Sequence, residues 1–107
     1  MNEMTAQAAH DAWRRGEVNL VDVREAHEHA TTHVAEMPFV PMSELADRID
    51  DLPLGKPLIV MCRSGARSAK VAGILNSQGR DDEAINLEGG ILAWAAIGLP
   101  YEGDAPS

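Results

Sequence analysis

Short apolar runs alternate with amphipathic segments along this chain of 107 residues. Three runs rich in Val, Ile and Leu are typical of buried strands, at 18–23, 58–61 and 84–87. Around them apolar positions recur with helical spacing, which predicts helices over 5–16, 43–49, 69–75 and 91–97. A polar stretch over 25–32 is long enough for one or two further helical turns.

Residues that favour helix ends support these boundaries. Thr5 and Ser43 can accept hydrogen bonds from the first turns of the helices that follow them. Pro53 should stop the second helix, and Gly79 suits the end of the third.

The alternation of strands and helices predicts parallel strand pairing and an α/β three-layer sandwich. We expect a further short strand over 36–40, at the edge of the sheet because it contains Pro38. From about residue 102 the chain is polar and has nothing to bury, so we expect a frayed tail. This length suits a single domain over 1–107.

The only cysteine of the chain, Cys62, directly follows the apolar run 58–61. Gly65 and a helical pattern come next, so we predict a buried strand, a tight loop and a helix. A loop that enters a helix points free backbone N–H groups at one spot, and the helix dipole adds positive potential there. The sequence therefore predicts an anion-binding loop that carries a thiol.

Charged residues surround this thiol. We expect Arg63 and Arg67 to make Cys62 ionise more readily than a free cysteine, and the thiolate is the reactive form. The alternative of a small buried hydrophobe fits the flanking arginines less well. Asp22 and Arg24 end a predicted strand, at the sheet edge where α/β proteins bind ligands. We expect them to form a salt bridge and to help position the Cys62 loop.

Composition restricts the function further. The formal net charge of −8 argues against nucleic acid as a partner. No apolar run approaches the ~20 residues of a membrane span, and the first residues lack the pattern of a signal peptide. A lone cysteine cannot form an internal disulfide, so we expect a reducing compartment, the cytoplasm.

Three histidines lie close together in the sequence: His27, His29 and His33. His27 and His29 would fall on different faces of a helix, and no cysteine lies near to add a soft ligand. We therefore expect no metal site and no cofactor.

Four sequence blocks resemble those of the rhodanese-domain sulfurtransferases. The first, Cys62-Arg-Ser-Gly-Ala-Arg67-Ser68, resembles the active-site loop of that family. The others are Leu20-Val-Asp22-Val-Arg24-Glu25, Thr32-His33-Val34 with Val40-Pro41-Met42-Ser43-Glu44-Leu45, and Leu87-Glu-Gly89-Gly90-Ile-Leu-Ala-Trp94 with Gly98-Leu-Pro100. They follow the order of the family and span nearly the whole chain. One departure is Thr32, where the family usually has glycine.

The resemblance implies a rhodanese-like fold, with a five-stranded parallel sheet flanked by helices on both faces. It implies that the nucleophile Cys62 takes sulfane sulfur from an anionic donor such as thiosulfate, as a persulfide, and passes it to cyanide or a thiol. The residues implied to bind the donor are Arg63, Ser64, Gly65, Ala66 and Arg67. Those implied to support the loop are Asp22, Arg24 and Ser68.

Three other functions must be weighed against this one. Cysteine phosphatases, and the arsenate reductases of the same fold, have five residues between cysteine and arginine, whereas four separate Cys62 from Arg67. A non-catalytic binding module would typically lack the cysteine. A persulfide carrier that serves a partner enzyme has the same sequence features as an independent sulfurtransferase, so this alternative stays open.

Overall fold

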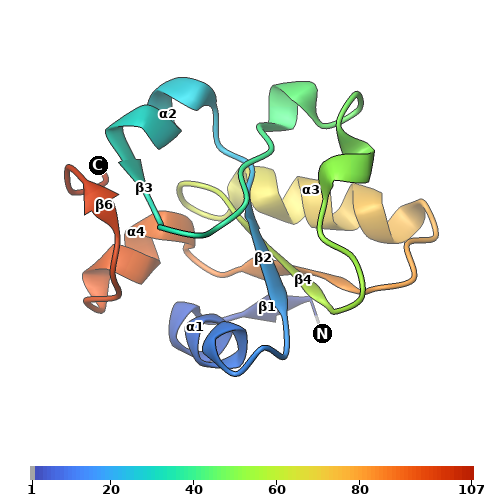
Figure 1. Cartoon of the computed structure of the whole chain (residues 1–107), viewed down its shortest axis with the longest axis horizontal. Coiled ribbons are helices and arrows are strands. Elements are labelled where there is room, and N and C mark those ends of the chain that lie inside the picture. The colour runs from blue at the N-terminus through green and yellow to red at the C-terminus, as the bar shows by residue number, and fades with distance from the viewer. Residues whose placement is uncertain (1) are drawn as a thin grey trace.

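The computed structural model describes residues 2–107 and centres on a parallel sheet (Figure 1). Four strands lie side by side in the order β1-β5-β4-β2. Their bounds are Glu3–Met4 for β1, Ala84–Leu87 for β5, Leu58–Met61 for β4 and Asn19–Asp22 for β2. All three pairings are parallel, so the carboxyl ends of the strands meet at one edge.

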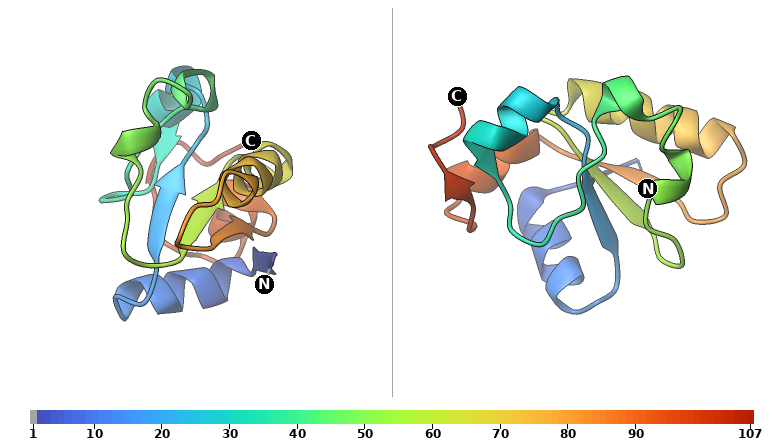
Figure 2. Two further views of the ribbon diagram at one scale, coloured as in Figure 1. Left: turned by 90° about the vertical axis from the view of Figure 1, so that its right-hand side faces the viewer. Right: turned by 45° about the horizontal axis from the view of Figure 1, so that its top comes forward.

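Helices cover both faces of the sheet, as the views in Figure 2 show. On one face, α1 (Ala6–Arg14) and α4 (Gly90–Ala96) pack on alternate strand residues such as Leu20 and Ile59. On the other face, α3 (Ala66–Ser77) packs on Val21, Val60 and their neighbours. Alternate residues of each strand thus contribute to two separate hydrophobic cores, one on each face of the sheet. The predicted three-layer α/β arrangement is confirmed.

The predicted five-stranded sheet is wrong in its strand count. The segment 36–40 meets β2 only at a single bridge between Asp22 and Phe39. Pro38 has no N–H to donate, and Glu36 has a φ of 69°, outside the range of a strand. β1 was not predicted, because two residues are too few to show a strand pattern.

The helix predicted after Ser43 is also wrong. The chain instead forms two 3-10 turns, η1 (Met42–Glu44) and η2 (Ile49–Asp51). Ser43 does not cap a helix, because its hydroxyl donates to Glu25 Oε1 at 2.5 Å. The cap predicted at Thr5 is present, since its Oγ1 accepts from the backbone N–H of Ala8.

The tail predicted to be frayed is ordered where it begins. β6 (Glu102–Gly103) pairs antiparallel with β3 (Thr32–His33), which follows α2 (Ala26–Thr31). The hydroxyl of Thr32, the residue that replaces the family's glycine, donates to the carbonyl oxygen of Asp104 at 2.5 Å. The tail is thereby tied to the end of α2. Within residues 2–107 no helix has the length and apolar character needed to cross a membrane.

The start of α4 fixes the loop that follows β4. The N–H of Ile91 donates to the carbonyl oxygen of Cys62 at 2.9 Å, and that of Leu92 donates to Arg63 at 3.2 Å. Gly90 makes this approach possible, because a Cβ there would lie 2.4 Å from the carbonyl oxygen of Arg63. Its φ of 59° also disfavours other residues.

We therefore expect Gly90→Ala to lower the free energy of unfolding by ~2–4 kcal/mol, through steric overlap and backbone strain. Gly73→Ala is the matched control, since a Cβ at Gly73 in α3 meets no atom within 4 Å. It should leave stability unchanged or raise it by up to ~1 kcal/mol. Denaturant unfolding checks both, and equal stability of the two variants would contradict the assigned role of Gly90.

Candidate active site

Cys62 lies at the carboxyl edge of the sheet, directly after β4. The loop 62–65 leads from this strand into α3, and the side chain of Cys62 is almost fully buried at 1% exposure. The ends of β2 and β5 flank β4 on either side. Strand, loop and helix follow one another as the sequence predicts.

The loop directs hydrogen-bond donors at the sulfur atom. The N–H of Gly65 lies 3.1 Å from Cys62 Sγ, and the hydroxyl of Ser68 lies 3.2 Å from it. Gly65 adopts a φ of 105° as the residue before α3, a conformation that favours glycine. A tight turn of this kind brings the backbone donors around to the sulfur.

These donors lower the pKa of the Cys62 thiol below its ordinary value. Burial alone would raise it, because the charged form loses hydration. Hydrogen bonds from the Ser68 hydroxyl and from the N–H groups of Ser68, Gly65 and Ser64 outweigh that cost. The pKa of the Cys62 thiol is lowered as expected, but the main causes are hydrogen bonds from Ser68 and the loop rather than the charges of the flanking arginines.

Asn86 extends this network and was missed in the sequence. Its Oδ1 accepts from the Ser68 hydroxyl at 2.5 Å, and its Nδ2 donates to Glu3 Oε2 at 3.3 Å. Ser68 has one hydroxyl proton, which can be donated to only one acceptor at a time. It can be donated to Asn86 Oδ1 while Cys62 is a thiol, and to Cys62 Sγ when Cys62 is a thiolate. A buried amide in the otherwise apolar strand β5 was the available signal.

Arg67 is held by an acidic residue that was not predicted either. Its two terminal nitrogens donate to the two carboxylate oxygens of Glu28, at 2.7 and 2.8 Å. Hydrogen bonding to Arg67 is the main cause that lowers the pKa of Glu28 to about 2. The charge of the Cys62 thiolate also favours the charged form of Arg67 and contributes, after Glu28, to its raised pKa.

Arg63 lies at the exposed side of the loop. Its Nε donates to the backbone carbonyl of Ser107 at 2.7 Å. Arg63 also lines a small groove of about 180 Å³ together with Glu28, His27 and residues 105–107. The tail, α2 and Arg63 of the loop thus meet at this groove.

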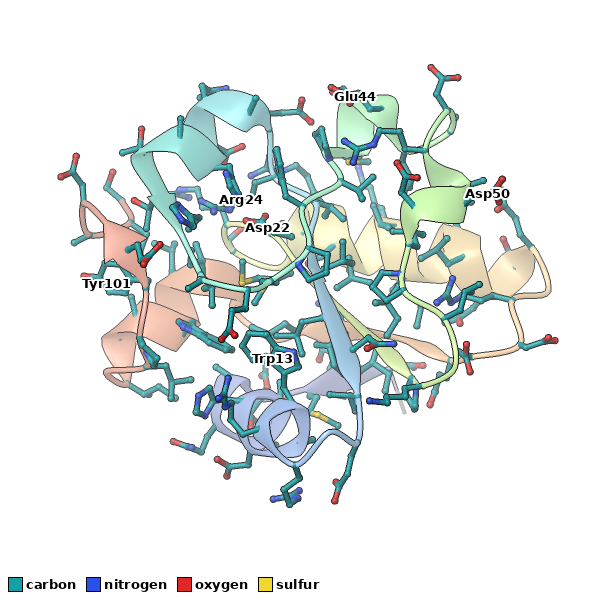
Figure 3. All side chains as sticks on the ribbon, viewed as in Figure 1. Trp13, Asp22, Arg24, Glu44, Asp50 and Tyr101 are labelled. Atoms are coloured by element: carbon teal, nitrogen blue, oxygen red, sulfur yellow. The ribbon has the colours of Figure 1, made fainter. Side chains whose placement is uncertain are left out.

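Asp22 and Arg24, labelled in Figure 3, form the predicted salt bridge. Arg24 Nη2 lies 2.7 Å from Asp22 Oδ2, and both side chains are almost fully buried. The same nitrogen donates to the carbonyl oxygen of Thr32 at 2.7 Å. The pair therefore ties the end of β2 to the end of α2, and so fixes the helix that carries Glu28.

Two of the three neighbouring histidines stack on each other. His29 stacks on His33 at 4.7 Å between ring centroids and on Phe39 at 4.2 Å. Burial lowers the pKa of His29. Among residues 2–107 no group of three or more His, Cys, Asp or Glu side chains is arranged to hold a metal ion.

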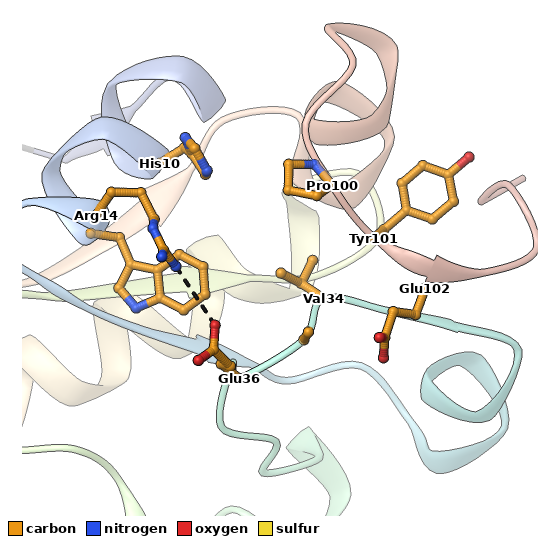
Figure 4. A pocket seen from close by; sticks show the side chains of 9 residues that line it. His10, Arg14, Val34, Glu36, Pro100, Tyr101 and Glu102 are labelled. Atoms are coloured by element: carbon orange, nitrogen blue, oxygen red, sulfur yellow. Dashed lines mark ion pairs between the residues drawn. The ribbon is translucent and has the colours of Figure 1, made fainter.

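A larger cavity, of about 560 Å³, lies away from these groups (Figure 4). Its walls come from α1, from 34–36 and from 100–102, and include Trp13 and Tyr101. An ion pair between Arg14 and Glu36 crosses its rim at 3.7 Å. No residue of the Cys62 loop lines it.

Comparisons with known proteins assign the family. Residues 5–97 match the Rhodanese-like domain. The chain belongs to the rhodanese-like family. It is 38% identical over 84 residues to a sulfurtransferase of Allochromatium vinosum, covering 78% of each chain. It is 31% identical over 101 residues to the thiosulfate sulfurtransferase GlpE of Actinobacillus pleuropneumoniae serotype 7, covering 92% of this chain and 93% of that protein.

The rhodanese-like fold agrees with solved structures. A rhodanese-related protein from Thermoplasma volcanium superimposes with a TM-score of 0.84 at 27% identity. The alignment covers 97% of this chain and all of that one. The resemblance seen in the four sequence blocks is thereby confirmed at the level of the family.

We expect Ser68→Ala to raise the pKa of the Cys62 thiol in this rhodanese-like loop, because the thiolate loses its hydroxyl donor while burial remains. The ultraviolet absorbance of the thiolate, followed against pH, measures the change. Ser77→Ala, at the other end of α3, is the control and should leave the titration unchanged. An identical titration in the wild type and Ser68→Ala would contradict the assigned role of Ser68.

The ion pair of Glu28 should make stability depend on pH in acid. Its pKa of about 2 in the folded state lies below the ordinary value, so its contribution is complete above that ordinary value and is lost as the pH falls toward 2. The difference corresponds to at most ~3 kcal/mol. Unfolding measured near neutral pH and in acid should show a smaller acid loss for Glu28→Gln than for the wild type. Equal losses would contradict the pairing.

Proposed function

We propose that this protein is a sulfurtransferase that carries sulfane sulfur as a persulfide on Cys62. The observation that carries the proposal is the set of donors aimed at Cys62 Sγ from the loop and from Ser68. Such a site favours a thiolate and leaves N–H groups to stabilise a further sulfur atom. The name of the GlpE relative supports thiosulfate as a donor.

In the first half-reaction the Cys62 thiolate attacks the outer sulfur of thiosulfate. A sulfur–sulfur bond forms to Cys62, and the bond between the two sulfurs of thiosulfate breaks with its electron pair leaving on sulfite. The charges balance, because a thiolate and a dianion become a persulfide anion and sulfite dianion. No protein base is required in this proposal, since the lowered pKa of Cys62 makes the thiolate more accessible and sulfite leaves readily.

In the second half-reaction the outer sulfur passes to cyanide or to a thiol, and Cys62 leaves as the thiolate. The chain contains a single cysteine, so no second thiol can resolve the persulfide within the chain. The acceptor must come from outside, either as a small molecule or as a partner protein. We place this reaction in the reducing environment of the cytoplasm.

The other loop residues bind rather than react. In this proposal the N–H groups of Ser64, Gly65 and Ala66 surround the transferred sulfur, as a turn entering a helix does for anions. Arg63 and Arg67 attract the anionic donor. Asp22, Arg24 and Ser68 position the loop through the contacts already described. No cofactor takes part.

The spacing from Cys62 to Arg67 supports sulfur transfer over phosphatase or arsenate reductase activity. The loop is one residue shorter than theirs, and it closes tightly on the sulfur, as the 3.1 Å contact of Gly65 shows. A cradle of this size suits one added sulfur atom better than a tetrahedral dianion.

Intact-mass spectrometry tests the proposal. The protein should gain the mass of one sulfur atom on treatment with thiosulfate and lose it again with cyanide. Cys62→Ser should show no gain, while its folding is checked by circular dichroism. A gain of the same size in Cys62→Ser, or hydrolysis of an aryl phosphate in place of the gain, would overturn the assignment.

A further inference from the structure

The charge by which Arg67 attracts an anionic donor is already paired with a carboxylate. Glu28 accepts hydrogen bonds from both terminal nitrogens of its guanidinium, and Glu28 Oε1 also accepts from the N–H of Glu25 at 3.1 Å. Glu28 is mostly buried, with 17% of its side chain exposed. An ion pair in which both oxygens of the carboxylate accept hydrogen bonds from one guanidinium holds its geometry well.

The charges around the Cys62 loop therefore nearly cancel. Arg63 and Arg67 contribute two positive charges, and Glu28 and Glu25 contribute two negative ones. Both carboxylates belong to the capping box of α2, and both favour the charged form of Arg67. The Asp22–Arg24 pair cancels internally. This site is less cationic than its two arginines alone suggest.

This balance matters because sulfur donors differ in charge. Thiosulfate brings two negative charges to a site that already holds the thiolate. A persulfide of a small thiol with an uncharged substituent brings at most one. A fixed negative charge next to Arg67 opposes the dianion more strongly than the monoanion, since Coulomb energy scales with the product of the charges.

We infer that Glu28 determines donor specificity and that this site prefers a monoanionic persulfide of a small thiol over dianionic thiosulfate. The inference rests on the proposed sulfur transfer through Cys62. The thiolate attacks the outer sulfur of the donor, a sulfur–sulfur bond to Cys62 forms, and the donor's own sulfur–sulfur bond breaks with its electron pair leaving on the small thiolate. One persulfide anion and one thiolate are present before and after the step.

The groove beside the loop suits such a donor. It measures about 180 Å³, and Glu28 and Arg63 both line it. In the inferred binding mode, the substituent of a small thiol persulfide lies in this groove, and Arg63, the neighbour of Cys62 in the chain, lines it. Glu28 would then face the group attached to the outer sulfur, and the charge of this group is what distinguishes thiosulfate from the persulfide of a small thiol.

Glu28→Gln tests the inference because it removes the charge and keeps the shape. The matched control is Glu17→Gln, since Glu17 also pairs with an arginine, Arg15, at 2.9 Å. Glu17 precedes β2, so this control pair lies at the sheet edge opposite Cys62. Glu28→Asp retains the charge and should keep the wild-type preference.

The measurement is the second-order rate of persulfide formation on Cys62 with two probes, thiosulfate and 2-hydroxyethyl persulfide. Each rate is divided by the rate of the same donor with free mercaptoethanol. This ratio corrects for the different intrinsic reactivities of the two donors. The wild type should prefer 2-hydroxyethyl persulfide. Glu28→Gln should raise the thiosulfate rate by about tenfold and change the other rate by less than about threefold. Glu17→Gln should change neither.

Three results would overturn the inference. A wild-type preference for thiosulfate would do so without any variant, even if Glu28→Gln failed to fold. An equal change for both donors in Glu28→Gln would show that Glu28 acts on the loop and not on donor charge. Loss of the preference in Glu28→Asp would do the same. Failure of the proposed function itself would look different, because neither donor would then load the wild-type protein with sulfur.

Discussion

The structure of the site depends on one short turn that must aim several N–H groups at a single buried sulfur atom. A thiolate at 1% exposure has lost most of its hydration, so protein donors have to replace the water. The turn achieves this with only three residues between Cys62 and the start of α3 at Ala66. Its outward-facing carbonyl groups then need partners of their own, and the first N–H groups of α4 supply them.

Several distant elements serve this turn. Cys62 directly follows β4, and Gly90 allows the start of α4 to lie against the carbonyl groups of Cys62 and Arg63. The buried Asp22–Arg24 pair fixes the end of α2, which in turn presents Glu28 to Arg67. The tail reaches the same region through β6 and through the bond from Arg63 to Ser107. The loop is thus held by contacts from residues far apart in sequence, as a preorganised electrostatic site requires.

Much of this could be predicted because it follows local rules. The strand–loop–helix around Cys62, the cap at Thr5 and the three buried strands all show in the order of apolar and polar residues. The salt bridge of Asp22 and Arg24 follows from two opposite charges at one strand end. Each of these features involves neighbours in the chain, so the sequence alone contains the relevant contacts.

The features that were missed depend on contacts between distant residues. Ser43 has the sequence context of a helix cap, but its hydroxyl donates a hydrogen bond to Glu25, which belongs to another segment. The polar composition of the tail predicts fraying, but its residues 102–103 pair with β3. Glu28 and Arg67 are 39 positions apart, and nothing in their local sequence indicates that they form an ion pair. Asn86 was the exception, because an amide inside an apolar strand can be noticed before its partner is known.

The most direct test of the account is a crystal structure of the protein after treatment with thiosulfate. We predict an additional sulfur atom bonded to Cys62 Sγ and placed within hydrogen-bonding distance of the N–H groups of the loop. Electron density for an unmodified Cys62, or for an added sulfur that points away from the loop amides toward the core, would contradict it.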